Sequence, residues 1–192
     1  MAPTAPDTII VLATRNTGKI HELAALLAPL GAEVRGLAEY PAIPEIPETG
    51  ETFEENALIK ARAVAEATGL VAVADDSGLV VDALHGAPGV YSARYSGEDA
   101  TDAKNNEKLL AALAGVPDER RGCRFVSVIA AAAPAALGGA FMTLRGTWEG
   151  RVAHERKGEN GFGYDPLFID MESPGQRRAA EMSREEKNAV SH

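Results

Sequence analysis

The sequence has a single cysteine, few aromatic residues and no long run of strongly hydrophobic residues. Cys123 cannot form a disulfide within the chain, so nothing indicates an oxidising compartment, and we expect it to be a buried strand residue. Residues 125–142 carry no charge, but they are rich in alanine and are interrupted by Pro134, which does not suit a membrane-spanning helix. No basic residue precedes the apolar residues 9–13, so the N-terminus does not resemble a signal peptide. We therefore expect a cytoplasmic protein with no membrane partner.

Positive charge is also scarce. The chain has 28 acidic residues against 19 lysines and arginines, which gives a formal net charge of −9. A field of that sign repels nucleic acid polymers and anionic membranes, so we expect neither as a partner. A small phosphorylated substrate remains compatible with this charge if it brings a cation or meets locally placed lysines and arginines.

The order of the predicted elements indicates an α/β fold with a mixed sheet flanked by helices. A β-branched run predicts a strand at 8–13, and helical spacing of apolar residues predicts a helix after Lys19 that ends at Pro29 and Gly31. Thr52 and Glu55 form a capping box for a helix that ends at Gly69. Further strands are expected at 32–37, 70–74, 79–84, 124–133, 140–148 and 167–170, and further helices at 99–113 and from Ser183.

A length of 192 residues suits one domain spanning 1–192, either with a single core or folded as two lobes around a central cleft. We expect the loops 39–51 and 86–97 to mark the boundary between the lobes.

The first candidate site is the polar turn between the first strand and the first helix. Backbone amides at a helix N-terminus, a glycine and a lysine suit the binding of phosphate oxygens. The turn is not a P-loop, because Ala13 and Ile20 stand where that motif needs a glycine and a hydroxyl residue. The alternative is an ordinary turn with Thr17 as the helix cap. The residues of this turn are Thr14, Arg15, Asn16, Thr17, Gly18 and Lys19.

Two adjacent acids, Asp75 and Asp76, directly follow an apolar run. Adjacent carboxylates repel each other unless a cation or a proton lies between them, and their hard oxygens suit Mg²⁺. The alternative is that residues 75–78 form a tight hairpin turn, because Asp, Ser and Gly favour turns. The run of apolar residues before the acids favours a metal ligand or a general base.

Three nearby residues have weaker claims to a function. The capping box is the ordinary role of Glu55. The simplest interpretation of Glu48 is a solvated loop acid, and that of Lys60 is a surface lysine. None of them would be selected on its own.

Two segments near the C-terminus could bind a flat base. The glycines on either side of Phe162 leave its ring open for stacking, and Asp165 is able to accept from a ring N–H. Taken alone, the better interpretation is a glycine-rich turn whose aromatic residues fill a core. The donors of Lys187, Ser191 and His192 lie close together on a helix and could read a carbonyl oxygen, although a solvated terminal helix is the simpler interpretation.

Taken together, these motifs resemble the inosine triphosphate pyrophosphatase family, in its bacterial form that acts on XTP and dITP. The resemblance extends over nearly the whole chain and rests on seven motifs in order. They are Thr14–Lys19, Glu48–Gly50 with Glu55–Ala57, Lys60–Arg62, Ala74–Gly78, Gly86–Gly97, Phe162–Pro166 and Glu185–His192.

The resemblance implies a homodimeric, Mg²⁺-dependent enzyme that cleaves non-standard purine nucleoside triphosphates to the monophosphate and pyrophosphate. Asp76 would be the general base and a metal ligand, and Glu48 would share the metal, with Asp75 and Glu55 as further candidates. The turn 14–19 would hold the triphosphate. Lys60 and Ser77 would also contact the substrate, and the base pocket would comprise Phe162, Gly163, Tyr164, Asp165, Lys187, Ser191 and His192.

The chain departs from the family pattern at two places. Arg15 stands where the family more often has a small residue, which we expect to alter the mouth of the phosphate site. The family also continues past the position of His192 with an arginine and a final helix, so we expect a truncated or partly ordered terminus. Two other functions remain open: a Maf-like pyrophosphatase acting on dTTP or UTP, and a nucleotide-binding sensor without turnover.

Overall fold

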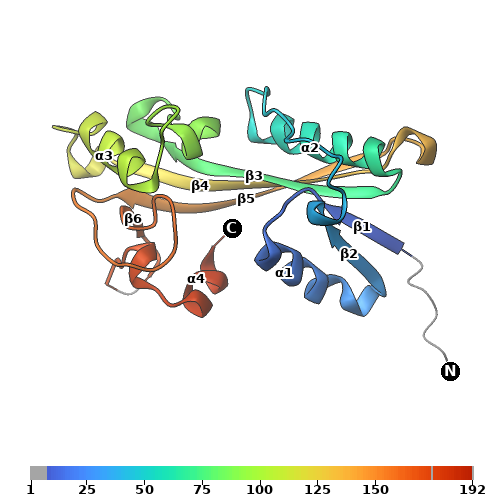
Figure 1. Ribbon diagram of the computed structural model, residues 1–192. Helices are drawn as coiled ribbons and strands as arrows, with labels where there is room; N and C mark the ends of the chain where they lie inside the picture. Colours follow the sequence, from blue (N-terminus) through green and yellow to red (C-terminus); the bar gives the residue numbers. More distant parts are fainter. Residues whose placement is uncertain (1–7, 174, 192) are drawn as a thin grey trace. The chain divides into compact units, whose positions relative to one another are not determined.

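The computed structural model describes residues 8–173 and 175–191, and these form a six-stranded sheet with helices on it (Figure 1). The strand order is β2-β1-β3-β4-β5-β6; β1 runs parallel to β2 and β3, and β5 is antiparallel to β6. This confirms the α/β fold with a mixed, helix-flanked sheet. The strands are β1 Thr8–Leu12, β2 Ala32–Gly36, β3 Val71–Val81, β4 Gly122–Ala132, β5 Phe141–Val152 and β6 Phe168–Asp170. The helices are α1 Thr17–Leu27, α2 Phe53–Thr68, α3 Asp102–Ala112 and α4 Arg184–Val190.

The chain divides into two compact units. One comprises the chain up to Asp76 together with Val128–Leu144, and the other comprises Ser77–Ser127 together with the chain from Arg145. The divisions fall inside β3, β4 and β5, so the expectation that the loops 39–51 and 86–97 mark the boundary is wrong. Within the described residues, no helix combines the length and apolar character that crossing a membrane requires.

The first unit is built on the parallel strands β1, β2 and β3. Helix α1 connects β1 to β2 on one face and α2 leads into β3 on the other (Figure 1). Crossover connections between parallel strands are right-handed. The connection from β1 to β2 and the connection from β2 to β3 cross the sheet in opposite directions, so their helices lie on opposite faces. Strand β1 pairs with the first residues of β3, with Leu12 opposite Val73, so β1 ends two residues short of the level of Asp75.

Helix α2 begins at the predicted capping box. The Glu55 amide donates to Thr52 Oγ1 at 3.2 Å, and the Thr52 amide donates to Glu55 Oε2 at 3.2 Å. Gly69 ends the helix in the left-handed region, with φ +70°. Both predictions, the capping box and the helix end at Gly69, are confirmed.

Strand β3 corrects the prediction of a hairpin turn at residues 75–78. Val71–Val81 is one continuous strand, and Ala72, Ala74 and Asp76 lie buried on one face. Gly78 is not part of a turn. It allows residues 89–92 to pack closely against β3, because a Cβ there would lie 2.4 Å from Ser92 Oγ and 2.6 Å from the Gly89 carbonyl oxygen. The turn preference of Asp, Ser and Gly is outweighed by the pairing of the whole segment within the sheet.

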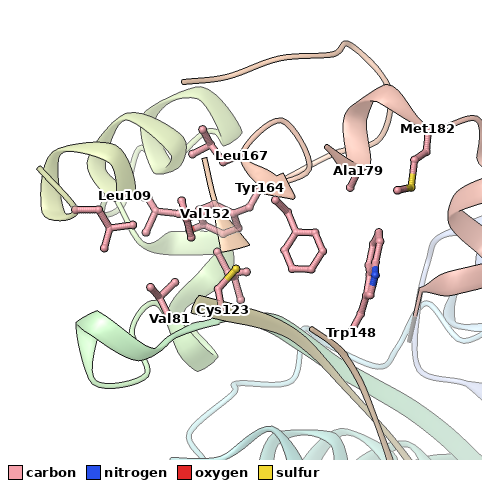
Figure 2. Packing of buried hydrophobic residues seen from close by; sticks show 12 residues of the cluster. Val81, Leu109, Cys123, Trp148, Val152, Tyr164, Leu167, Ala179 and Met182 are labelled. Atoms are coloured by element: carbon pink, nitrogen blue, oxygen red, sulfur yellow. The ribbon is translucent and has the colours of Figure 1, made fainter. Parts of the chain in front are cut away.

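The core of the second unit joins β3, β4 and β5 to the segment around β6 (Figure 2). The Trp148 ring packs on Phe168 with a centroid distance of 4.7 Å. Tyr164 and Leu167, on either side of the predicted glycine-rich loop's end, are both buried in this cluster. Cys123 is buried in β4 as expected, and burial raises the pKa of its thiol. The loop that carries Phe162 therefore leaves and re-enters a well-packed core.

Candidate active site

The turn from β1 to α1 has the form of an anion-binding helix start. Asn16, and not Thr17, is the N-cap: its Oδ1 accepts from the Gly18 amide at 2.9 Å and from the Lys19 amide at 3.4 Å. Residues 15–19 are exposed, so the N-terminal end of α1 and its lysine are open to a ligand. The positive end of the helix dipole favours a phosphate group at this place.

Arg15 and Thr14 support this turn. The Arg15 guanidinium donates to the Ile43 carbonyl oxygen at 3.2 Å, which ties the turn to the proline-rich loop before α2. Thr14 Oγ1 accepts from the Asn16 amide at 3.1 Å. Arg15 thus has a bracing contact that a small residue would not make.

Carboxylates and lysines from four segments of the first unit meet at Asp75 and Asp76, in the middle of β3. Lys60 Nζ lies 2.6 Å from Glu48 Oε1 and 3.6 Å from Asp76 Oδ1. Lys19 Nζ lies 2.5 Å from Asp75 Oδ2. We refer to Lys19, Glu48, Lys60, Asp75 and Asp76 as the acid–lysine cluster; it consists of the Lys19–Asp75 pair and of Lys60 with Glu48 and Asp76, joined by the adjacent residues Asp75 and Asp76 of β3.

Asp76 has the electrostatic properties of a general base. Burial raises the pKa of its carboxyl above the ordinary value, while the charge of Lys60 lowers it and the negative charge of Glu48 raises it. A hydrogen bond with Asn56 also lowers this pKa. A carboxylate with a raised pKa is a stronger proton acceptor, which suits it to take a proton from water.

The Glu48 loop is held against α2 by a close packing contact. The Gly50 amide donates to Asn56 Oδ1 at 2.8 Å, and Asn56 is completely buried. A Cβ on Gly50 would lie 2.6 Å from the Cβ of Glu55, so only glycine allows this approach. Asn56 therefore sets the position of the loop that carries Glu48.

Glu55 has its ordinary role as a capping residue. Its Oε2 accepts from the amides of Glu51 at 2.7 Å and Thr52 at 3.2 Å. A further role as a metal ligand stays a prediction. Ser77 follows Asp76 on β3 and is exposed on the opposite face of the strand.

The carboxylates of Glu48 and Asp76 suit Mg²⁺. Within residues 8–173 and 175–191 no group of three or more His, Cys, Asp or Glu side chains forms a ready metal site. Two carboxylates, those of Glu48 and Asp76, nevertheless approach the same Lys60 ammonium. Mg²⁺ is usually bound through one or two carboxylates together with substrate phosphates and water, so two acids of this kind fit a metal that arrives with a polyphosphate.

A second cluster lies in the second unit and centres on the buried Asp165, whose residue is 1% exposed. Asp165 Oδ2 accepts from the Phe162 amide at 2.9 Å and from Lys187 Nζ at 2.5 Å. Lys187 Nζ also lies 4.7 Å from the centroid of the Phe162 ring. We refer to residues 161–165 as the Phe162 loop.

The two aromatic residues of the Phe162 loop have opposite environments. Phe162 is 76% exposed, so its ring is available for stacking. Tyr164 is buried and its hydroxyl donates to the Ser92 carbonyl oxygen at 2.9 Å, and burial raises its pKa. The core-filling interpretation is therefore correct for Tyr164, whose side chain anchors the loop.

The remaining candidates lie at or after α4. Ser183 starts this helix as predicted and forms a capping box with Glu186, which places Lys187 in the first turns. Ser191 is the C-cap residue and its amide donates to the Lys187 carbonyl oxygen at 2.8 Å. His192 lies outside the described residues. The sequence interpretation missed Asp102 and Asn106, which contact Gly163 from α3; the available signal was two adjacent asparagines, poor helix formers, inside a helix.

The comparisons with known proteins agree over nearly the whole chain. The sequence model of the Ham1 family matches residues 10–192. A dITP/XTP pyrophosphatase of Nitratidesulfovibrio vulgaris is 59% identical over 189 residues, which cover 95% of this chain and 89% of that protein. A dITP/XTP pyrophosphatase of Exiguobacterium sibiricum is 52% identical over 183 residues, which cover 95% of this chain and 90% of that protein.

Solved structures give the same result. A HAM1 protein from Coxiella burnetii superposes with a TM-score of 0.89 at 47% identity, covering 96% of this chain and 92% of that one. The nucleoside-triphosphatase / dITP/XTP pyrophosphatase from Mycobacterium abscessus superposes with a TM-score of 0.85 at 49% identity, covering 96% of this chain and 94% of that one.

Proposed function

The chain belongs to the Ham1 family, and on that premise we propose that it hydrolyses non-standard purine nucleoside triphosphates to the monophosphate and pyrophosphate. Relatives that are 52–59% identical are named dITP/XTP pyrophosphatases, which supports dITP, ITP and XTP as the substrates. The structural observation that carries the proposal is the pair of short contacts from Lys60 to Glu48 and Asp76. This pair puts a buried base, a second acid and a cation at one point.

The triphosphate is held by the turn 14–19. Amides at the start of α1 and the Lys19 ammonium offer donors to phosphate oxygens. Lys19 is paired with Asp75 in the free protein, at 2.5 Å, so substrate oxygens replace that carboxylate when they bind. Asn16 keeps the turn closed by its two capping bonds.

Glu48 and Asp76 would hold Mg²⁺ when it arrives with the substrate, and Asp75 would be the next carboxylate available. When bound, Mg²⁺ neutralises charge on the phosphates and on the leaving pyrophosphate. Lys60 keeps the two carboxylates in place, because its ammonium lies between them at 2.6 Å and 3.6 Å.

Asp76 accepts the proton of the water that attacks the α-phosphorus. Its pKa is raised by burial, so it is a better proton acceptor than an exposed aspartate. Lys60 and Lys19 add positive charge where negative charge develops in the transition state. Positioning and electrostatic stabilisation account for most of the catalysis of phosphoryl transfer.

The Lys187–Asp165 pair offers a basis for the choice of purine. A 6-oxo purine presents a carbonyl acceptor beside a ring N–H donor, which complements a lysine donor beside a carboxylate acceptor. Adenine presents an amino donor beside a ring-nitrogen acceptor, so both contacts would be mismatched. Each mismatched polar contact in a closed site costs about 1–3 kcal/mol, so two of them give roughly hundredfold discrimination or more. Phe162 supplies the stacking surface.

The test is a panel of nucleotides assayed for pyrophosphate and orthophosphate, with Mg²⁺ and with Mg²⁺ removed by a chelator. We expect pyrophosphate from dITP, ITP and XTP, much less from dATP, and none without the metal. Faster turnover of dTTP or UTP would support a Maf-like pyrophosphatase instead. Calorimetric binding of dITP with no product would support a sensor, and orthophosphate as the first product would contradict attack at the α-phosphorus.

A further inference from the structure

Helix α3 holds both polar main-chain groups of Gly163. Asp102 Oδ2 accepts from the Gly163 amide at 2.7 Å, and Asn106 Nδ2 donates to the Gly163 carbonyl oxygen at 2.7 Å. Asp102 and Asn106 are four residues apart, so they lie on the same face of α3. The two contacts span 61 and 57 residues of sequence, so they join separate parts of the second unit.

Gly163 is the residue that separates the exposed ring from the buried one. Its φ of +60° lies in the left-handed region, and this turn sends Phe162 outward while Tyr164 enters the core. Tyr164 is fixed by its bond to Ser92 and Asp165 is fixed by Lys187. The clamp on Gly163 fixes the link between these anchors, so the direction of Phe162 is set before any ligand binds.

Asn105 explains why α3 contains two adjacent asparagines. Its Nδ2 donates to the carbonyl oxygens of Ser92 at 3.3 Å and Ala93 at 3.0 Å, and its Oδ1 accepts from the Ser96 amide at 2.7 Å. Asn105 therefore holds the segment that anchors Tyr164, while Asn106 holds Gly163. Both asparagines are buried, and both bind main chain of other segments, which offsets their poor helix propensity.

We propose that Asp102 and Asn106 are positioning residues that hold the Phe162 ring ready to stack on the purine base. A loop rich in glycine loses conformational entropy when it orders on a ligand, and a clamp in the free protein removes that cost from binding. The identity of the base rests on the proposed function, whereas the clamp is a property of the free protein and is testable without turnover.

The test replaces the exposed member of the clamp by Asp102→Ala. Asp102→Asn keeps a side-chain oxygen as an acceptor and serves as the conservative variant, and Glu107→Ala removes another exposed acid of α3 as the matched control. Hydrogen exchange of the Gly163 amide is measured in the free proteins. We expect protection to fall roughly tenfold in Asp102→Ala, to be largely restored in Asp102→Asn and to be unchanged in Glu107→Ala.

Kinetics then connect the clamp to the base. For Asp102→Ala we expect the KM for dITP to rise roughly tenfold while kcat stays within about threefold, because only the cost of ordering the loop changes. Inhibition by tripolyphosphate, which has no base to stack, stays unchanged. Equal losses for dITP and tripolyphosphate, or unaltered exchange at Gly163, would overturn the proposal. If the native protein hydrolyses none of the nucleotides, the proposed function fails and the exchange result alone decides the clamp.

Discussion

Two glycines of the Phe162 loop allow a matched test of the contact between the loop and Asp165. Gly161 has φ +76° and Gly163 has φ +60°, so alanine at either position costs about 1–2 kcal/mol in the left-handed region. The positions differ in their surroundings: a Cβ on Gly161 would lie 1.9 Å from Asp165 Oδ2, whereas a Cβ on Gly163 meets nothing within 4 Å.

The expected difference in stability between Gly161→Ala and Gly163→Ala follows from the displacement of the Asp165 carboxylate. Contacts of a Cβ below 3.0 Å are essentially unknown, so Asp165 Oδ2 has to move by about 1 Å to admit the methyl group. A shift of that size breaks its hydrogen bond from the Phe162 amide, at 2.9 Å, or its ion pair with Lys187, at 2.5 Å. Loss of one hydrogen bond to a charged group costs about 1.5–3 kcal/mol, which is the expected excess for Gly161→Ala over Gly163→Ala.

Urea denaturation followed by Trp148 fluorescence measures this difference in the free energy of unfolding. Trp148 is the chain's only tryptophan and belongs to the same buried cluster as Tyr164, so it reports on the unit that contains the loop. We expect kcat/KM for dITP to fall at least tenfold further in Gly161→Ala than in Gly163→Ala. Equal destabilisation by the two alanines would refute the reasoning, because strain alone would then explain both.

The remaining predictions concern catalysis, the core and acid stability. Asp76→Asn lowers kcat for dITP by about a hundredfold or more without lowering Tm, because the neutral amide removes a proton acceptor and also the cost of burying a charge; a matching loss in Glu107→Gln, assayed in parallel, would contradict this. Arg121 is buried and donates to the carbonyl oxygens of Leu113, Val152 and Ala153 at 2.8–2.9 Å, so Arg121→Met removes three buried hydrogen bonds from a charged group and lowers the free energy of unfolding by about 3 kcal/mol or more. The exposed neighbour variant Arg120→Met should leave denaturation curves nearly unchanged, and similar effects of the two would show that the buried bonds do not matter. Hydrogen bonds from Lys157 and the Arg178 amide lower the pKa of Glu181 below its ordinary value of 4.5, so its contribution to stability is present above that pH and is lost as the pH falls through the lowered pKa. Glu181→Gln should therefore flatten the decline of unfolding free energy below about pH 4.5, and an unaltered acid limb would disprove the assignment.

The sequence predicts helices and strands correctly where the local preference of the residues matches their place in the sheet. The capping box at Thr52, the helix start at Ser183 and the strands at 32–36 and 168–170 are found where expected. The prediction is wrong at residues 75–78, where local turn preference opposes the pairing of β3. It is also wrong for the cap of α1, because Asn16 and Thr17 are both good caps and only the structure shows which side chain reaches the amides.

The site is predictable in composition but not in its internal contacts. Lys19, Asp75 and Asp76 could be nominated from their local chemistry, whereas Glu48 and Lys60 could be nominated only through the family resemblance. The opposite directions of Phe162 and Tyr164 could not be predicted, because they depend on Ser92, 72 residues from Tyr164, and on Asp102, 61 residues from Gly163. Contacts of that sequence separation leave no local periodicity to read.

The charge of the acid–lysine cluster indicates why a cation belongs to the proposed reaction. Two ammonium groups, Lys19 and Lys60, are paired with Asp75 and Glu48, and Asp76 adds a third carboxylate. An ionised cluster of this composition has no positive excess with which to attract a triphosphate, and the whole chain carries −9. If Glu48, Asp75 and Asp76 held a divalent cation, it would supply positive charge there, and Lys19 and Lys60 would be available to phosphate oxygens. We therefore expect the ion pairs of the free protein to be replaced when substrate and metal bind.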